Sequence, residues 1–197
     1  ERFLCVEYLN IRKLRDFKNN GFVIFKNFLG EDLCRAIIEI ANNDLERLIP
    51  PVELERQVGY KGAPISDSFF GAKTARRLLQ AYSRDSSIKR WALSNKVKNP
   101  LSGMLGGRPM LSLDHHNCIM TKLPGFSSIT EWHQDIRYWH FKRPELISVW
   151  SALGRENVRN GCLWVVPGSH KRRFDWGQFD SKKFFKKAPK TNHKILA

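Results

Sequence analysis

The sharpest chemical feature of the sequence is the tripeptide His133-Gln134-Asp135. In a β-strand, residues two positions apart point to the same face, so this imidazole and carboxylate would project together. Both groups bind divalent first-row metals, and a second histidine would complete the 2-His-1-carboxylate set that holds non-haem Fe(II). The spacing therefore predicts a metal site. The pattern also occurs by chance in many proteins, so a structural histidine beside an acid is the alternative interpretation.

The segments around this tripeptide read as strands from residue 110 onward. Each is rich in β-branched and aromatic residues and is bounded by Gly, Pro or Asn. Asn160-Gly161 suits a hairpin turn, and Pro167-Gly168 would end a strand and turn the chain. The four strand-like runs cover residues 110–124, 129–139, 146–153 and 161–169.

The first half of the chain reads mainly as helices. The expected elements are a helix over 6–20 ended by Gly21, a buried strand over 22–25, a helix from Glu31 with Leu33, Ala36, Ile37 and Ile40 on one face, an irregular stretch over 52–70, helices over 72–82 and 86–93, and a loop from Gly103 to Pro109. Helices followed by strands predict an α+β fold rather than a βαβ repeat. We expect one domain over residues 1–197, helical to about residue 108 and β from about 110.

Composition excludes several classes of protein. The chain has 197 residues and 42% hydrophobic residues, enough for a buried core and against wholesale disorder. The apolar runs are too short for a transmembrane helix, and the first ten residues do not resemble a secretory leader. The four cysteines (Cys5, Cys34, Cys118 and Cys162) form no CxxC motif. This spacing predicts reduced thiols in a cytoplasmic protein rather than a disulfide scaffold or a zinc ribbon.

The charge is strongly basic, with a formal net charge of +15. Residues 171–197 hold nine basic and two acidic residues, which is nearly half of the excess. A basic balance suits polyanions or an anionic substrate, but a solvated, flexible surface segment is the favoured interpretation. Nucleic acid is not the favoured partner, because the aromatic residues of this segment are not evenly interleaved. These aromatic residues could instead form a lid over an active site: Phe174, Trp176, Phe179, Phe184 and Phe185.

Several ordered motifs around the tripeptide resemble the phytanoyl-CoA dioxygenase family of Fe(II)/2-oxoglutarate oxygenases. The similarity is strong over about residues 110–171 and weaker over 15–40. The pieces that match are Trp132-His133-Gln134-Asp135, the run Ser148 to Leu153, Asn160-Gly161-Cys162-Leu163 through Pro167-Gly168-Ser169-His170, Asn20 to Ile24, and Met120 to Gly125.

The resemblance implies a double-stranded β-helix of the jelly-roll or cupin type, with His133 and Asp135 as the first two iron ligands. In such enzymes 2-oxoglutarate chelates the iron, and molecular oxygen converts it to succinate and CO2 while a small-molecule substrate is hydroxylated. By position, Gln134, Trp150 and Cys118 look like residues that line the cosubstrate pocket. For Trp150, ordinary aromatic core is an equal alternative. Because Asp135 is present, hydroxylation is favoured over the halogenation that some members perform.

The sequence departs from the family pattern after His170, which belongs to a turn signature and is not read as a ligand. The family pattern needs a distal histidine and, about ten residues later, an arginine that pairs with the far carboxylate of 2-oxoglutarate. The chain has only His193 after that point, in a segment that resembles the start of the next barrel strand, and no arginine follows Arg173. We therefore expect a C-terminally incomplete barrel. The alternatives are a catalytically inactive barrel that acts in binding or assembly, and a basic polyanion-binding module. Substrate identity and oligomeric state are left open.

Overall fold

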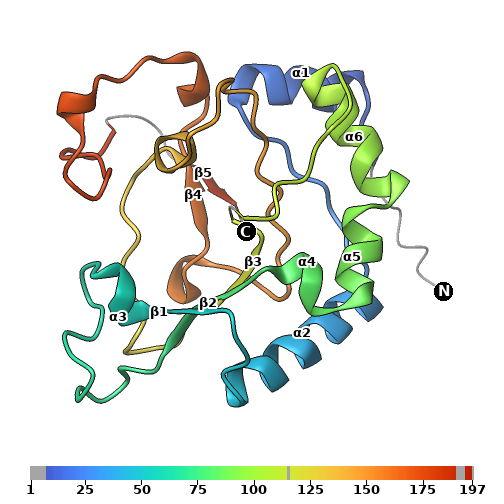
Figure 1. The fold of residues 1–197 in the computed structure, drawn as a ribbon. Helices are drawn as coiled ribbons and strands as arrows, with labels where there is room; N and C mark the ends of the chain where they lie inside the picture. Colours follow the sequence, from blue (N-terminus) through green and yellow to red (C-terminus); the bar gives the residue numbers. More distant parts are fainter. Residues whose placement is uncertain (1–7, 115, 190–193, 197) are drawn as a thin grey trace. The chain divides into compact units, whose positions relative to one another are not determined.

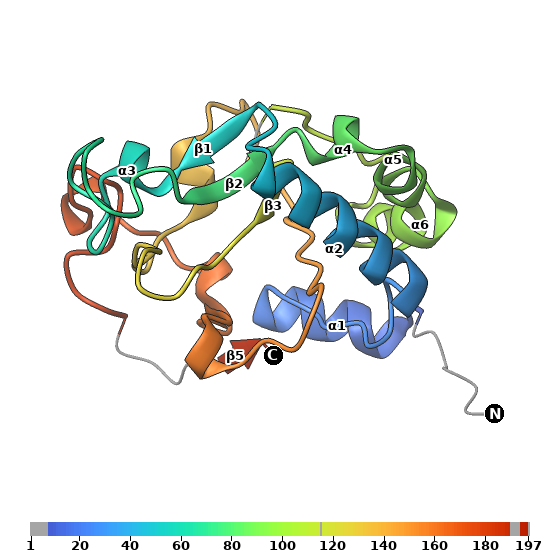
Figure 2. The ribbon, with the colours of Figure 1, turned by 90° about the horizontal axis from the view of Figure 1, so that it is seen from below.

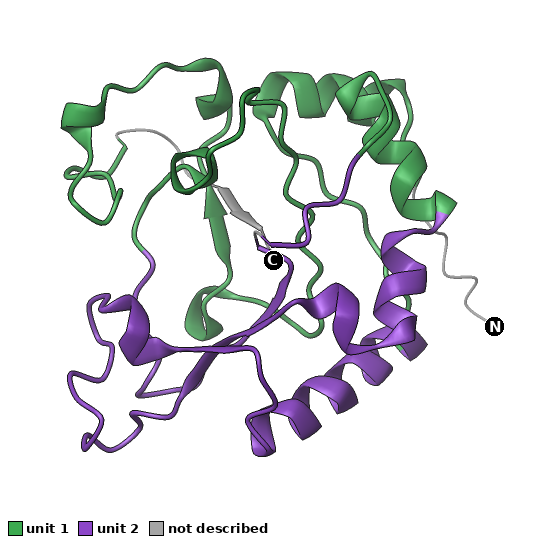
Figure 3. Ribbon diagram, in the orientation of Figure 1, with its two compact units in different colours: residues 1–31, 95–109, 131–197 green, residues 32–94, 110–130 purple. Residues whose placement is uncertain are grey.

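The computed structural model describes residues 8–114, 116–189 and 194–196. The chain forms two compact units, each assembled from separate stretches of sequence (Figures 1 and 3). Unit 1 comprises Glu1–Glu31, Asn95–Pro109 and Glu131–Ala197, and unit 2 comprises Asp32–Ser94 and Met110–Thr130. The single domain expected from the sequence stays a prediction. Within the described part of the chain, none of the helices has the length and apolar character that a transmembrane span needs.

Unit 2 is built on a three-stranded antiparallel sheet in the order β1-β2-β3 (Figure 2). Its core lies on one sheet face, where Leu78 pairs with Val52 on one side and with Ile119 on the other. The Leu78 side chain is fully buried, which makes β2 the most buried strand of the sheet. The elements of this unit are α2 Glu31–Glu46, β1 Val52–Leu54, α3 Glu55–Val58, β2 Ala75–Leu79, α4 Ala81–Arg84, α5 Ser86–Ala92 and β3 Cys118–Met120.

Buried polar contacts join the elements of unit 2. Arg84 donates to an Asp44 carboxylate oxygen at 2.6 Å and to the Pro51 carbonyl at 2.6 Å, which ties α4 to α2 and to the start of β1. Glu55, whose side chain is fully buried, accepts hydrogen bonds from the backbone N–H and the hydroxyl of Ser128. Such paired burial avoids the large cost of an isolated charge in the interior.

Unit 1 contains two packed helices and a two-stranded antiparallel sheet (Figure 1). Helices α1 and α6 lie side by side, and Gly103 lets Leu9 approach so closely that an added Cβ would be 2.7 Å from its Cδ2. In the sheet, Trp164 of β4 pairs with Ile195 of β5. The elements of this unit are α1 Ile11–Asn20, α6 Asn95–Leu105, η1 Asp135–Tyr138, η2 Val158–Asn160, β4 Leu163–Val165, η3 Ser169–Lys171, η4 Trp176–Gln178 and β5 Lys194–Leu196.

The turn at Gly21, which ends α1, packs against the segment that follows β4. Gly21 has a φ of 83° and its N–H bonds to the Phe17 carbonyl, so it ends α1 in the left-handed conformation that favours glycine. A Cβ at this position would collide with the His170 ring, whose Nε2 lies 3.2 Å from the Lys18 carbonyl. His170 therefore packs against the end of α1, in agreement with its interpretation as part of a turn.

Several predicted elements are confirmed. The first helix is present but begins at Ile11, the second is α2, and the helix over 86–93 is α5. The predicted strand over 161–169 contains β4, and the segment after His193 contains β5, which pairs with it. In α2 the expected face is at least half-buried, with Ile37 and Ala41 the most buried apolar residues. These elements have strong local signals, such as the Asn10 cap and Gly21 stop of α1.

Four predictions for the first half are wrong. Residues 22–25 are outside any strand and only partly buried. The helix expected over 72–82 is instead β2 followed by the short helix α4, because pairing on both strand edges outweighs the helix propensity of Ala, Arg and Leu. The irregular stretch 52–70 contains β1 and α3, and the loop expected from Gly103 begins as the last turn of α6.

The second half has fewer strands than predicted. Among the described residues of 110–124 only β3 is a strand, 129–139 contains the 3-10 helix η1, and 146–153 is irregular with Trp150 46% exposed. Strand-forming residue types alone did not produce strands here, since a strand also needs a neighbour to pair with. The observed architecture is a mixture of helices and short sheets. The double-stranded β-helix stays a prediction.

Candidate metal and ligand site

His133 is held in place by its backbone neighbours and by two aromatic rings. Its Nδ1 lies 2.8 Å from the Glu131 carbonyl oxygen, and because a carbonyl only accepts, Nδ1 carries the proton. The ring packs edge-on to Tyr138 at 5.6 Å and lies 6.0 Å from Phe184, with which His133 also forms an isolated β-bridge. The other ring nitrogen, Nε2, lies on the side of Asp135, 3.2 Å from its Oδ1.

Asp135 brings its carboxylate to that nitrogen. It begins the 3-10 helix η1, so the two residues do not share the strand that the sequence predicts, yet their side chains meet with Nε2 and Oδ1 3.2 Å apart. The second oxygen, Oδ2, accepts a hydrogen bond from the Ser148 hydroxyl at 3.1 Å. One carboxylate oxygen is thus directed by Ser148, and the other faces the imidazole.

This pair fits a divalent first-row metal as two of its ligands. Two ligand atoms each about 2.1 Å from one ion and at right angles lie about 3.0 Å apart, close to the 3.2 Å seen here. Metal-binding histidines usually donate their other ring N–H to a carbonyl or carboxylate, as Nδ1 does to Glu131. The described residues contain no cluster of three or more His, Cys, Asp or Glu side chains that could hold a metal. His193, which the sequence analysis considered, lies outside the described residues.

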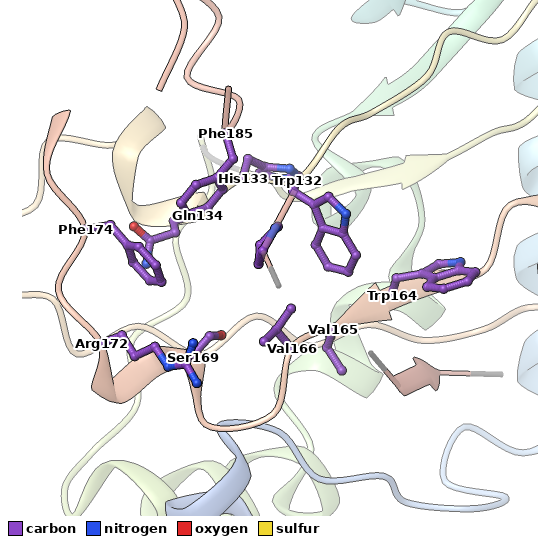
Figure 4. A pocket seen from close by; sticks show the side chains of 11 residues that line it. Trp132, His133, Gln134, Trp164, Val165, Val166, Ser169, Arg172, Phe174 and Phe185 are labelled. Carbon is purple, nitrogen blue, oxygen red and sulfur yellow. The ribbon is translucent and has the colours of Figure 1, made fainter. Parts of the chain in front are cut away.

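A cavity of ≈ 160 Å³ within unit 1 is lined in part by His133 (Figure 4). Its volume is many times what one water molecule needs, so a small organic ligand has room. The lining is mostly apolar, and Arg172 contributes a permanently charged group. The lining residues are Trp132, His133, Gln134, Trp164, Val165, Val166, Ser169, Arg172, Phe174, Phe185 and Pro189.

Residues 174–186, which we call the cap segment, form one wall of this cavity and bond to both sides of η1. The Phe185 N–H donates to the Trp132 carbonyl at 2.8 Å, on the side before His133. The Tyr138 hydroxyl donates to the Lys182 carbonyl at 2.8 Å, on the side after Asp135. The aromatic and basic run of the sequence therefore contributes Phe174 and Phe185 to the wall of the cavity, and its role as a lid over an active site stays a prediction.

Gln134 lines the cavity and is oriented by Arg137. The Arg137 Nε donates to Gln134 Oε1 at 2.8 Å, and its Nη2 donates to the Phe174 carbonyl at 2.5 Å. Burial lowers the pKa of Arg137 below its ordinary value, and the charge of Asp175 acts against that shift. The arginine remains charged at neutral pH, so it is a fixed donor at this position.

The two other predicted cosubstrate residues are placed differently. Trp150 donates from Nε1 to both carboxylate oxygens of Glu156 at 3.1 and 3.2 Å, and it is not among the described residues that line the cavity. Cys118 is in β3 of unit 2, where burial raises the pKa of its thiol, with the charges of Arg77 and Glu53 as smaller influences. Their predicted roles at a cosubstrate pocket stay predictions.

Sequence reasoning missed the residues that support the pair. Ser148 was noticed only as part of a strand-like run, and Arg137 and Arg172 were counted only in the total charge. Arg137 lies two residues after Asp135 and therefore had a positional signal. Ser148 lies thirteen residues after Asp135 along an irregular path, and nothing in the sequence alone places its hydroxyl on that carboxylate.

Comparison with known proteins assigns the family. A family model described as "Phytanoyl-CoA dioxygenase (PhyH)" matches residues 17–194, nearly the whole chain. The chain belongs to the phytanoyl-CoA dioxygenase family. The resemblance seen in the sequence is confirmed. The family is one of Fe(II)/2-oxoglutarate-dependent dioxygenases, and His133, Gln134 and Asp135 lie inside the matched region.

The curated relatives of this chain have low sequence identity to it and are longer proteins. Peroxisomal phytanoyl-CoA dioxygenase of Mus musculus is 25% identical over 169 residues, which is 83% of this chain and 48% of that protein. The Homo sapiens protein of the same name is 24% identical over 172 residues, with the same coverage. Phytanoyl-CoA dioxygenase 1 of Oryza sativa subsp. japonica is 30% identical over 87 residues, 44% of this chain and 30% of that protein.

The chain thus spans about half the length of the peroxisomal relatives it matches. No solved structure shows a significant match to it. Since the mouse and human relatives are named peroxisomal, the cytoplasmic location expected from the cysteines stays a prediction.

Proposed function

We propose that this chain carries the first two iron ligands, His133 and Asp135, of an Fe(II)/2-oxoglutarate-dependent dioxygenase that hydroxylates a small molecule and releases succinate and CO2. The observation that carries the proposal is the meeting of Nε2 and Oδ1 at 3.2 Å, with the other imidazole nitrogen bonded to the Glu131 carbonyl. Family membership over residues 17–194 supports the same assignment.

We assign metal-binding, cosubstrate-binding and supporting roles to residues of the chain. His133 and Asp135 would hold Fe(II), and Gln134 would contact the cosubstrate in the adjoining cavity. When bound, Fe(II) with 2-oxoglutarate supplies the oxygen activation that hydroxylates the substrate. The Ser148 hydroxyl donates a hydrogen bond to Oδ2 of Asp135, so that Oδ1 would be directed at the metal. Trp132, Trp164 and Phe185 provide apolar walls that limit access of water.

The first experiment is an anaerobic titration of the chain with Fe(II) and 2-oxoglutarate, followed by the visible charge-transfer band of a 2-oxo acid chelated to iron. We expect a saturable band that is lost in Asp135→Ala. The matched control is Asp114→Ala, which removes an exposed aspartate of unit 2 and should leave the band unchanged. Oxygen-dependent succinate formation, lost in His133→Ala, is the second readout.

A protein that is demonstrably folded by circular dichroism and gives no band would contradict the proposal for this chain. In that case the inactive barrel, acting in binding or assembly, becomes the better description. An unchanged band in Asp135→Ala would show that the metal is bound elsewhere.

An anionic group on the substrate is supported by Arg172. Arg172 lines the cavity together with Ser169, and most of the other lining side chains are apolar. A guanidinium is suited to pair with a carboxylate or phosphate, and apolar walls accept the remainder of a ligand. We expect hexanoate to bind better than hexanol, as measured by ligand-observed NMR, and Arg172→Gln to abolish the difference. Equal binding of the two probes would remove this part of the proposal.

A further inference from the structure

Arg137 lies at the junction between the metal pair and the cap segment. It belongs to η1, which begins at Asp135, and its guanidinium bonds in two directions. Nε donates to the Gln134 side chain, and Nη2 donates to the carbonyl of Phe174, the first residue of the cap segment. One side chain thus connects a residue beside the metal ligands to a wall of the cavity.

The same guanidinium is stacked by two aromatic rings of the cap segment. Its central carbon lies 3.9 Å from the ring centroid of Phe179 and 4.6 Å from that of Trp176. Phe179 is buried, with 5% of its surface exposed, and its ring also packs at 4.2 Å against Phe185, which lines the cavity. Cation–π contacts of this kind are strengthened when the cation is partly desolvated, as the lowered pKa of Arg137 indicates.

The hydrogen bond to Gln134 also determines which end of its amide faces the cavity. Arginine only donates, so the amide oxygen must point to Arg137. The amide NH2 group is then left for the cavity, where Figure 4 shows the Gln134 side chain near Phe174. The Gln134 amide would therefore present N–H donors to the cavity, and these could bond a carboxylate or carbonyl oxygen of a ligand.

We infer that Arg137 is the positioning residue of this site: it fastens the cap segment onto η1 and holds the Gln134 amide with its donors toward the cavity. The first part depends only on contacts within unit 1. The second rests on the proposed function, because it assigns 2-oxoglutarate as the ligand that receives those donors.

Limited trypsin digestion tests the fastening of the cap segment. The segment contains Lys182, Lys183 and Lys186, at which an opened segment would be cut. We expect Arg137→Lys to increase cleavage at these sites by about tenfold, because a lysine keeps the charge but loses the forked donors and the planar stacking. Mass spectrometry of the first fragments identifies the sites, and cleavage in unit 2 should not change.

Two further variants keep this test decisive. Arg159→Lys, at an exposed arginine on η2, is the matched control and should cleave like the wild type. Trp176→Ala removes one stacking ring whose side chain is 64% exposed, so folding should persist, and cleavage should rise by about threefold. Wild-type cleavage rates in both Arg137→Lys and Trp176→Ala would overturn the inference.

The amide orientation is tested by 2-oxoglutarate binding to the Mn(II)-loaded chain, measured by calorimetry. Gln134→Glu keeps an acceptor for Arg137 but replaces the donors that face the cavity with a second carboxylate oxygen. We expect 2-oxoglutarate to bind about tenfold more weakly to the variant when both proteins are saturated with Mn(II). Unchanged affinity would refute the amide role. Absence of any binding to the wild type would count against the proposed function instead, and the trypsin result would still stand on its own.

Discussion

At the scale of single residues, the hydrogen bond from Ser148 determines which oxygen of Asp135 faces His133 and the proposed metal. The Ser148 hydroxyl donates to Oδ2 at 3.1 Å, and Oδ1 is the oxygen that lies near His133 Nε2. A carboxylate that is already bonded at one oxygen loses less orientational freedom when the other binds a metal. Because Ser148 is exposed, its contribution should be smaller than that of a buried partner.

We predict that Ser148→Ala weakens Mn(II) binding by several-fold, at or below the lower end of the roughly 10- to 100-fold loss typical of such supporting residues. Electron paramagnetic resonance of free Mn(II) measures the affinity directly. Ser151→Ala, three residues along the same irregular segment, is the matched control and should bind as the wild type does. If both serine variants match the wild type, Ser148 is a surface contact without influence on the metal.

At the scale of elements, the sequence was most informative where the signal is local. Helix α1 ends at Gly21, which the sequence predicted, but its N-cap Asn10 was not recognised and the start was placed too early. The strand β2 was misread as a helix, because its identity depends on pairing with β1 and β3, whose partner residues are tens of positions away. The candidate site shows the same difference between local and long-range signals. His133 and Asp135 were proposed as ligands from their spacing in the sequence. The contacts of Ser148 and Arg137 could be identified only from the folded structure.

The helix α5 provides a test of this local signal. Its N-cap is Asp85, whose carboxylate accepts from the Ser87 N–H at 2.7 Å and from the Ser87 hydroxyl at 2.6 Å. These hydrogen bonds, the side-chain one first, lower the pKa of Asp85 below its ordinary value of 3.8. We predict that Asp85→Ala lowers the free energy of unfolding by about 1 kcal/mol at pH 7, as measured by urea denaturation.

The dependence on pH follows from the direction of that shift. A carboxyl whose pKa is lower in the folded state stabilises the fold above its ordinary value of 3.8, and loses this contribution as the pH falls through the folded value. The difference between wild type and Asp85→Ala should therefore shrink at pH 3 and below. Asp114→Ala, at an exposed position of the same unit, should differ little from the wild type at either pH. A gap that is constant with pH would mean that Asp85 does not act through its charged form.

At the scale of the whole molecule, the net charge of +15 predicts attraction to polyanions that is general rather than specific. In unit 1 part of this charge has a structural role, since Arg137 stacks within the cap segment and the Lys186 ammonium donates to the Gly177 carbonyl. We predict that a single-stranded oligonucleotide binds at low salt and is released at about 0.15 M salt, where the Debye length is about 8 Å. Fluorescence anisotropy measures this release, and tight binding at that salt concentration would favour the polyanion-binding alternative over the oxygenase.

When ligands are added, the rates of hydrogen–deuterium exchange should change differently in the two units. Mn(II) alone would contact His133 and Asp135, so we predict slower exchange at residues 133–138 and no change in the β1-β2-β3 sheet of unit 2. Adding 2-oxoglutarate should extend the protection to the cap segment through Gln134 and Arg137. Exchange in the cap segment that stays unchanged on addition of 2-oxoglutarate would contradict the roles of Gln134 and Arg137 in this response.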